Sequence, residues 1–148
     1  MKIKQIFQII SYLQYPLLLL AMVFVFKPYF SGLDHMKENF DAVVADFNNV
    51  LIFAGLGISM STLQDTNRTQ NNISKKIWED PQKGTWAIII LSIMTLSVLL
   101  GGIFSFYIST NEILKQLSIG IIVMGIGLIG FLKASLEIFE NHRRDRNF

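Results

Sequence analysis

Residues 84–111, GTWAIIILSIMTLSVLLGGIFSFYISTN, contain no charged side chain. A helix of about 20 apolar residues crosses the hydrocarbon core of a bilayer, which is roughly 30 Å thick, so this stretch is long enough to span a membrane. Three further uncharged stretches, residues 5–26, 47–64 and 116–132, meet or nearly meet that length. With 51% hydrophobic and 16% charged residues, the chain also differs from ordinary soluble domains. The sequence therefore predicts an all-α integral membrane protein, with four transmembrane helices in an antiparallel bundle.

The predicted spans leave few residues outside the membrane. Domains smaller than about 40 residues rarely fold unaided, so we expect residues 1–148 to form a single membrane domain. The first span has a basic start, but its apolar run is too long for a signal peptide and no small-residue cleavage pattern follows Phe26. We therefore expect it to be retained. The predicted spans cover about residues 8–28, 42–63, 85–109 and 113–138, and a cytoplasmic loop covers about residues 64–84.

The 13 basic residues are divided unequally between the two sides of the predicted spans. Cytoplasmic flanks of transmembrane helices carry the excess of lysine and arginine. The sparser side has Lys27, Lys37 and Lys115. We therefore expect a protein of the cell membrane, with both termini and the loop between the second and third spans in the cytoplasm. The richer side has Lys2, Lys4, Arg68, Lys75, Lys76, Lys83, Lys133, Arg143, Arg144 and Arg146.

Several classes of chemistry are not expected from this sequence. The absence of cysteine excludes disulfides and thiol catalysis, and neither histidine, His35 nor His142, lies in a span where it could ligate a membrane haem. Asp34, His35 and Glu38 fall within about one helical turn, but a metal site would need further ligands. Residues 125–130 match GxGxxG, yet no βαβ context surrounds them. We expect no catalytic residue, no cofactor, no metal and no nucleic-acid partner.

The second span carries the polar residues Asp46, Asn48 and Asn49, which form our candidate intramembrane polar site. Ionisable groups inside spans are costly and usually face other helices or water. Asp46 should lie only about one turn below the outer surface. We therefore favour a structural role, such as pairing with Lys115, over ion or substrate binding.

Small residues recur at regular spacing in the third and fourth spans. In a membrane they mark helix interfaces, because they let two backbones approach closely. The connection between these spans is very short, so we expect a tight hairpin with Asn111 as the N-cap of the fourth span and Glu112 in its first turn. The two small-residue faces either pack together within the hairpin or serve a second subunit. The candidate packing face comprises Ser97, Gly101, Ser105 and Ser109 in the third span and Gly120, Gly127, Gly130 and Ala134 in the fourth.

The loop between the second and third spans contains a short amphipathic segment, residues 73–80. It is either a helix lying on the cytoplasmic face of the membrane, with tryptophan at the headgroup level, or a simple tether. Lys75, Lys76 and Trp78 are the candidate interfacial contact.

No pattern in the sequence identifies an activity. The preferred hypothesis is a non-enzymatic accessory protein or a self-associating bundle subunit, whose partners are the lipid bilayer and either another protein or a second copy. The alternative is a small oligomeric channel or transporter, with a pathway lined by the polar residues of the second span and the serines of the third.

Overall fold

The computed structural model describes residues 3–30, 32, 38–66 and 72–147, and every element within them is helical. Four helices are long and apolar enough to cross a membrane, counting α1 and α2 as one rod. The predicted all-helical class is confirmed, and so is the expected number of helices long and apolar enough to span a membrane. The elements are α1 (Ile3–Ser11), α2 (Gln14–Phe30), α4 (Phe40–Ser61), α5 (Asn72–Trp78), α6 (Pro81–Ile108), α7 (Glu112–His142) and the 3-10 helix η1 (Arg144–Asn147).

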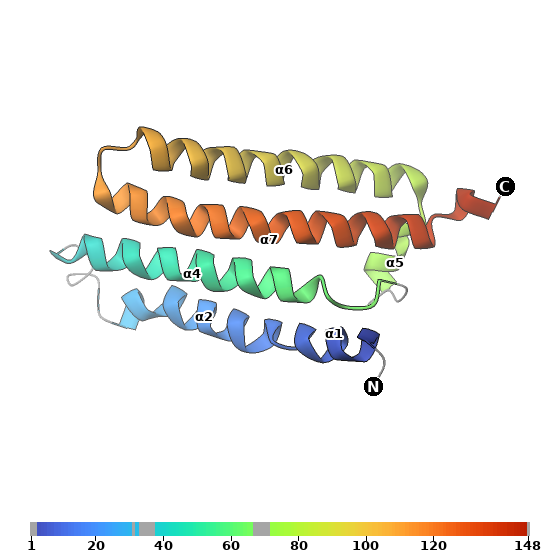
Figure 1. Cartoon of the computed structure of the whole chain (residues 1–148), viewed down its shortest axis with the longest axis horizontal. Coiled ribbons are helices and arrows are strands. Elements are labelled where there is room, and N and C mark those ends of the chain that lie inside the picture. Colours follow the sequence, from blue (N-terminus) through green and yellow to red (C-terminus); the bar gives the residue numbers. More distant parts are fainter. Residues whose placement is uncertain (1–2, 31, 33–37, 67–71, 148) are drawn as a thin grey trace.

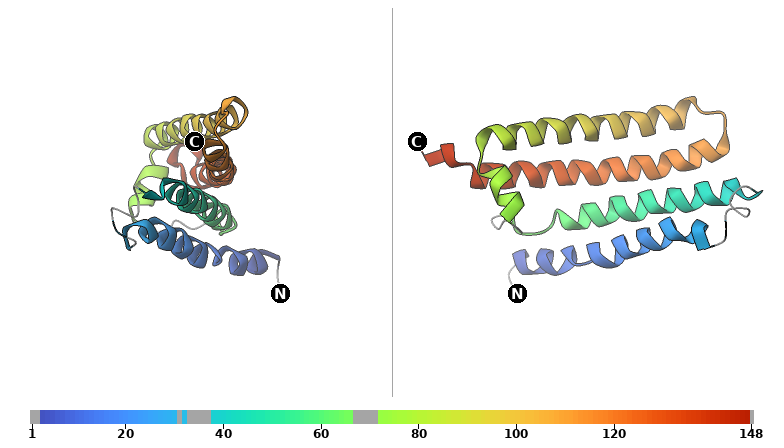
Figure 2. Two further views of the ribbon diagram at one scale, coloured as in Figure 1. Left: turned by 90° about the vertical axis from the view of Figure 1, so that its left-hand side faces the viewer. Right: turned by 180° about the vertical axis from the view of Figure 1, so that it is seen from behind.

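The long helices lie side by side in a row, in the spatial order α2, α4, α7, α6 (Figures 1 and 2). α4 packs against α2 on one side and α7 on the other, and α6 packs against the far side of α7. Within the described part of the chain, α2 and α6 each make extensive contact with one long helix. The spatial order therefore differs from the chain order, because α7 is inserted between α4 and α6.

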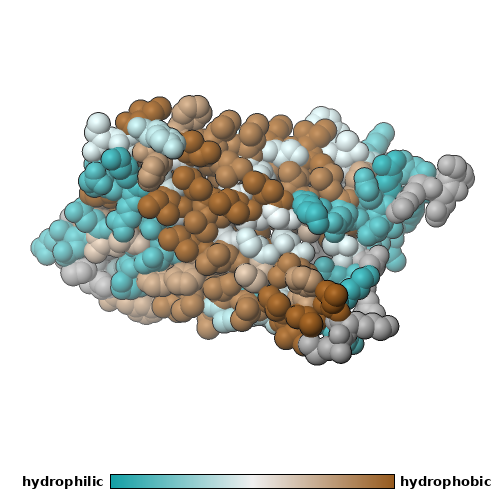
Figure 3. Space-filling view, in the orientation of Figure 1, coloured by the Kyte–Doolittle hydropathy of each residue, from teal (hydrophilic) through white to brown (hydrophobic). Residues whose placement is uncertain are grey.

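Hydrophobic side chains cover the middle of the face shown in Figure 3, and hydrophilic ones gather at its two ends. The start of α1, the helix α5 and the end of α7 lie together at one end of the row (Figure 1); we call it the α5 end. This distribution is the one that a bilayer requires of helices exposed to lipid.

The rod formed by α1 and α2 is interrupted at Tyr12 and Leu13. Pro16 has no N–H to donate to the Tyr12 carbonyl four residues earlier, and this carbonyl instead accepts from the Tyr15 backbone N–H, at 3.1 Å. The interruption therefore precedes Pro16 by one turn.

Glycines give α4 and α7 their closest approach. A Cβ added to Gly127 would overlap the Gly55 carbonyl oxygen, and a Cβ added to Gly55 would lie 2.7 Å from the Met124 Cα. Further along, a Cβ on Gly120 would lie 2.8 Å from the Asn48 carbonyl oxygen. The two backbones can touch only because these side chains are absent.

α6 and α7 form a hairpin whose turn follows the prediction. The Asn111 carboxamide oxygen accepts from the Ile113 backbone N–H at 2.9 Å, so Asn111 is the N-cap of α7, as expected. At the other end, α6 begins with Pro81 after the N-cap Asp80, whose carboxylate accepts from the Gln82 and Lys83 backbone N–H groups. Both caps satisfy donors that would otherwise lack partners.

Candidate functional site

Asp46 is 7% exposed and lies in the second turn of α4. Its carboxylate is 2.7 Å from the Lys27 ammonium, in the last turn of α2. The same ammonium lies 5.8 Å from the centre of the Phe24 ring. The partner suggested from the sequence, Lys115, was wrong, because Lys115 pairs with Glu112 at 3.4 Å. The buried Asp46 carboxylate is therefore neutralised by Lys27 of the neighbouring helix α2.

Asn48 makes the corresponding connection to α7. Its carboxamide oxygen accepts a hydrogen bond from the Gly120 backbone N–H at 2.9 Å, and both residues are buried. The third member of the candidate polar site, Asn49, is half-buried on α4. Two of the three polar side chains thus join α4 to its two neighbours.

The structure divides the candidate packing residues between different surfaces. Gly120, Gly127 and Gly130 face α4, where Gly130 lies beside Thr62, whereas Gly102, next to the predicted Gly101, faces α7 against Ile121 and Ile122. A Cβ added to Gly101 would have no atom within 4 Å. The remaining members are the exposed Ser97, the half-buried Ser105 and Ser109, and Ala134, which lines a cavity described below.

The segment between α4 and α6 contains the short helix α5. Of the two predicted alternatives, a helix and a simple tether, the first required such a helix. Lys75 and Lys76 are exposed on it, and Lys75 lies 3.6 Å from Glu79. Trp78, in contrast, is 9% exposed, and its ring centre is 6.4 Å from that of Phe139 on α7. The tryptophan is therefore part of a helix contact.

One salt bridge and one backbone hydrogen bond join η1 to Glu79, the residue that follows α5. The Arg144 guanidinium lies 2.6 Å from the Glu79 carboxylate, and the Arg144 backbone N–H donates to the Glu79 carbonyl at 3.3 Å. The Arg144 hydrogen bond holds the pKa of Glu79 below its ordinary value. Nearby, the hydrogen bond from the Lys83 backbone N–H lowers the pKa of Asp80. Arg143 lies over the Phe139 ring, 5.5 Å from its centre.

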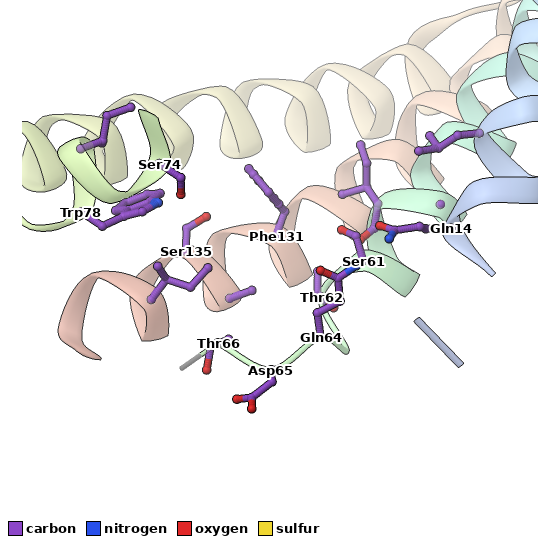
Figure 4. Close-up of a pocket in the computed structure, with 16 residues that line it drawn as sticks. Gln14, Ser61, Thr62, Gln64, Asp65, Thr66, Ser74, Trp78, Phe131 and Ser135 are labelled. Atoms are coloured by element: carbon purple, nitrogen blue, oxygen red, sulfur yellow. The ribbon is translucent and has the colours of Figure 1, made fainter. Parts of the chain in front are cut away.

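A cavity of about 550 Å³ lies at the α5 end of the row, between α2, α4, α5 and α7. Figure 4 shows Gln14, Ser61, Trp78 and Ser135 around it, one from each of these helices. Its volume is within the range of about 300–1,000 Å³ that is common for small-molecule sites. This cavity is the candidate binding site of the protein. Its apolar lining is formed by Leu18, Ile58, Ile77, Phe131, Ala134 and Ile138.

Sequence reasoning did not identify this cavity. The signal that could have indicated it was the presence of two polar residues, Gln14 and Ser135, inside predicted spans. Several other residues used in the sequence argument, Lys2, Asp34, His35, Lys37 and Arg68, lie outside the described residues.

Comparisons of the chain with protein families, with curated proteins and with solved structures find no match.

Proposed function

We propose that the chain is an integral protein of the cell membrane, with antiparallel spans and with both termini and α5 on the cytoplasmic side. The support is the agreement between the apolar middle of the row and the excess of basic residues near its α5 end. The described basic residues of this group are Lys4, Lys75, Lys76, Lys83, Lys133, Arg143 and Arg144.

Within the membrane, we propose that the protein is a non-enzymatic accessory or self-associating subunit. The observation that carries this proposal is the row itself, in which α6 packs extensively against α7 and leaves its opposite face exposed. Ser97 and Gly101 lie on that exposed face. Small side chains allow the backbone of another helix to approach closely in lipid. This face therefore suits a helix of another membrane protein or of a second copy.

The polar groups favour this function over a channel or transporter within one chain. Asp46 is paired with Lys27, and Asn48 is bonded to Gly120, so these groups are engaged in contacts between helices. The serines of α6 lie on the far side of α7 from α4. A pathway lined by both sets would need residues from more than one chain.

The proposal is tested by purification in mild detergent from the native membrane, followed by native mass measurement. We expect a stoichiometric partner or a defined oligomer. Gly101→Leu should reduce the associated fraction severalfold, because the added side chain occupies the space where the second helix would approach. The control is Leu96→Phe, which also enlarges an exposed side chain of α6 but at about 100° of helical rotation from Ser97. A wild-type protein that is purely monomeric and without a companion would refute the proposal.

A further inference from the structure

Two buried polar side chains that line the cavity have no hydrogen-bond partner within the described part of the chain. Gln14 is 8% exposed and Ser135 is 2% exposed. Serine hydroxyls in helices often bond to the carbonyl four residues earlier, as Ser118 does here with Leu114 at 2.7 Å. Among the described residues, every fully enclosed side-chain nitrogen or oxygen has a partner. The free groups of Gln14 and Ser135 therefore retain access to open space, and that space is the cavity.

Trp78 contributes a third group. Its indole N–H can only donate, and no acceptor for it is found among the described residues. Figure 4 shows the nitrogen-bearing edge of the ring directed toward the interior of the cavity. The contact with Phe139 holds the ring in this place. Three elements thus present unused hydrogen-bonding groups to one space, and leaving such groups unpaired is costly.

The polar lining residues gather in a level toward the α5 end, where Ile77 and Ile138 also contribute, and the level toward the middle of the row is apolar. On α2, Gln14 lies one turn nearer the α5 end than Leu18. On α7, Ser135 lies one turn nearer that end than Phe131. α4 repeats the pattern, with Ser61 nearer the end than Ile58. A ligand that satisfies both levels has a polar head toward the α5 end and an apolar chain toward the middle of the row.

The lining also defines the charge of the ligand. No lysine or arginine is among the described residues that line the cavity. Asp65 is the charged residue among them, and it already has interactions elsewhere in the protein. Among these described lining residues a buried anionic head would therefore find no counter-charge, which is strongly unfavourable. An uncharged head with hydroxyl and carbonyl groups matches the free donors and acceptors.

We propose that this cavity binds an uncharged, single-chain lipid whose head carries an ester and hydroxyl groups, as in a monoacylglycerol. The ester carbonyl accepts from the Trp78 N–H, and the hydroxyls bond to Gln14 and Ser135. The acyl chain contacts Leu18 and Phe131. This binding is independent of the association proposed for the exposed face of α6.

Trp78 supplies the probe for a direct test. The chain has two tryptophans, and Trp86 is 65% exposed on α6, so a Trp86→Phe background leaves Trp78 as the single reporter. The protein is placed in phosphatidylcholine nanodiscs and titrated with a monoacylglycerol brominated in its acyl chain. We expect saturable quenching of Trp78 that unlabelled monooleoylglycerol reverses.

Two variants examine the two levels of the site. Ser135→Ala removes one hydrogen bond and should weaken binding about threefold to tenfold. Ser118→Ala is the matched control, because Ser118 is an equally buried serine of α7 whose hydroxyl is already bonded. Ala134→Phe fills the cavity and should abolish saturable quenching. Retained far-UV circular dichroism and elution volume establish that each variant is folded.

Three outcomes would overturn the proposal. The first is quenching that rises without saturation, which indicates dissolved lipid around the protein. The second is equal weakening by Ser135→Ala and Ser118→Ala. The third is competition by oleate or phosphatidylglycerol that equals competition by monooleoylglycerol, because the site would then not select an uncharged head.

Discussion

Replacing Gly127 by alanine should separate α4 from α7. The added Cβ would overlap the Gly55 carbonyl oxygen and lie 3.0 Å from the Gly55 carbonyl carbon. Carbon atoms in contact prefer about 3.5–4.0 Å, so the helices would have to move apart by roughly 0.5–1 Å at this point. Backbone atoms of two helices cannot rotate out of the way. We expect the variant to lose about 1–3 kcal/mol of stability, as is typical of overpacked interfaces.

Gly101→Ala provides the matched control. Both glycines are in the interior of a long helix, but nothing lies within 4 Å of a Cβ at Gly101. In the unassociated chain, at low protein concentration in micelles, alanine should therefore stabilise α6 there by about 0.5–1 kcal/mol, because it restricts the unfolded chain more than glycine does. Gly125→Ala should be intermediate, since its Cβ meets the flexible end of the Leu99 side chain, 2.6 Å away.

The three variants are compared by unfolding in mixed micelles with increasing mole fraction of sodium dodecyl sulfate, followed by far-UV circular dichroism. The expected order of stability is Gly101→Ala, then Gly125→Ala, then Gly127→Ala, with about 2–3 kcal/mol between the extremes. A Gly127→Ala protein as stable as Gly101→Ala would show that α4 and α7 do not approach each other in this way.

Two further perturbations examine the charged contacts. Lys27→Met leaves the buried Asp46 carboxylate without its cation and should destabilise the protein by about 1–3 kcal/mol. Adding Asp46→Asn should recover most of this loss in the same unfolding assay. A double variant no more stable than Lys27→Met would contradict the pairing. At the α5 end, the lowered pKa of Glu79 means that its contact with Arg144 contributes stability at neutral pH and loses it as the pH falls below the ordinary glutamate range. The protection of the η1 amides, measured relative to their intrinsic exchange rate at each pH, should therefore fall on acidification. Glu79→Gln should lower this protection already at neutral pH, and equal protection in both proteins would argue against the contact.

Hydropathy predicted the four long helices because a bilayer imposes a minimum length on each apolar segment. Hydropathy could not predict which helices are neighbours. Helices in lipid gain little free energy from covering apolar surface, so an apolar face does not by itself indicate which helix it contacts. The predicted glycines of α7, Gly120, Gly127 and Gly130, marked a packing face without identifying its partner. That partner is α4, whereas Gly125 faces Leu99 of α6.

The third span shows that spacing alone does not identify which side of a helix packs within the chain. Ser97 and Gly101 are four residues apart, which matches a familiar interface pattern, but both are exposed. Thr95 and Gly102, seven residues apart, are buried on α6. Adjacent residues on a helix differ by about 100° in direction, so choosing Gly101 instead of Gly102 changes the predicted face. The seven-residue spacing of Thr95 and Gly102 was the signal that could have indicated the side of α6 that packs against α7.

The cavity follows from the order of the helices in the row. Because α7 is inserted between α4 and α6, the connection from α4 to α6 must cross the α5 end of α7 (Figure 1). α5 is the helical part of this crossing, and it carries Trp78 onto Phe139. The same crossing separates α5 from α2, and the space between them is lined by Gln14 on one side and Trp78 on the other. A direct α4–α6 hairpin would place no element there, so the site that we propose for an uncharged lipid depends on the insertion of α7.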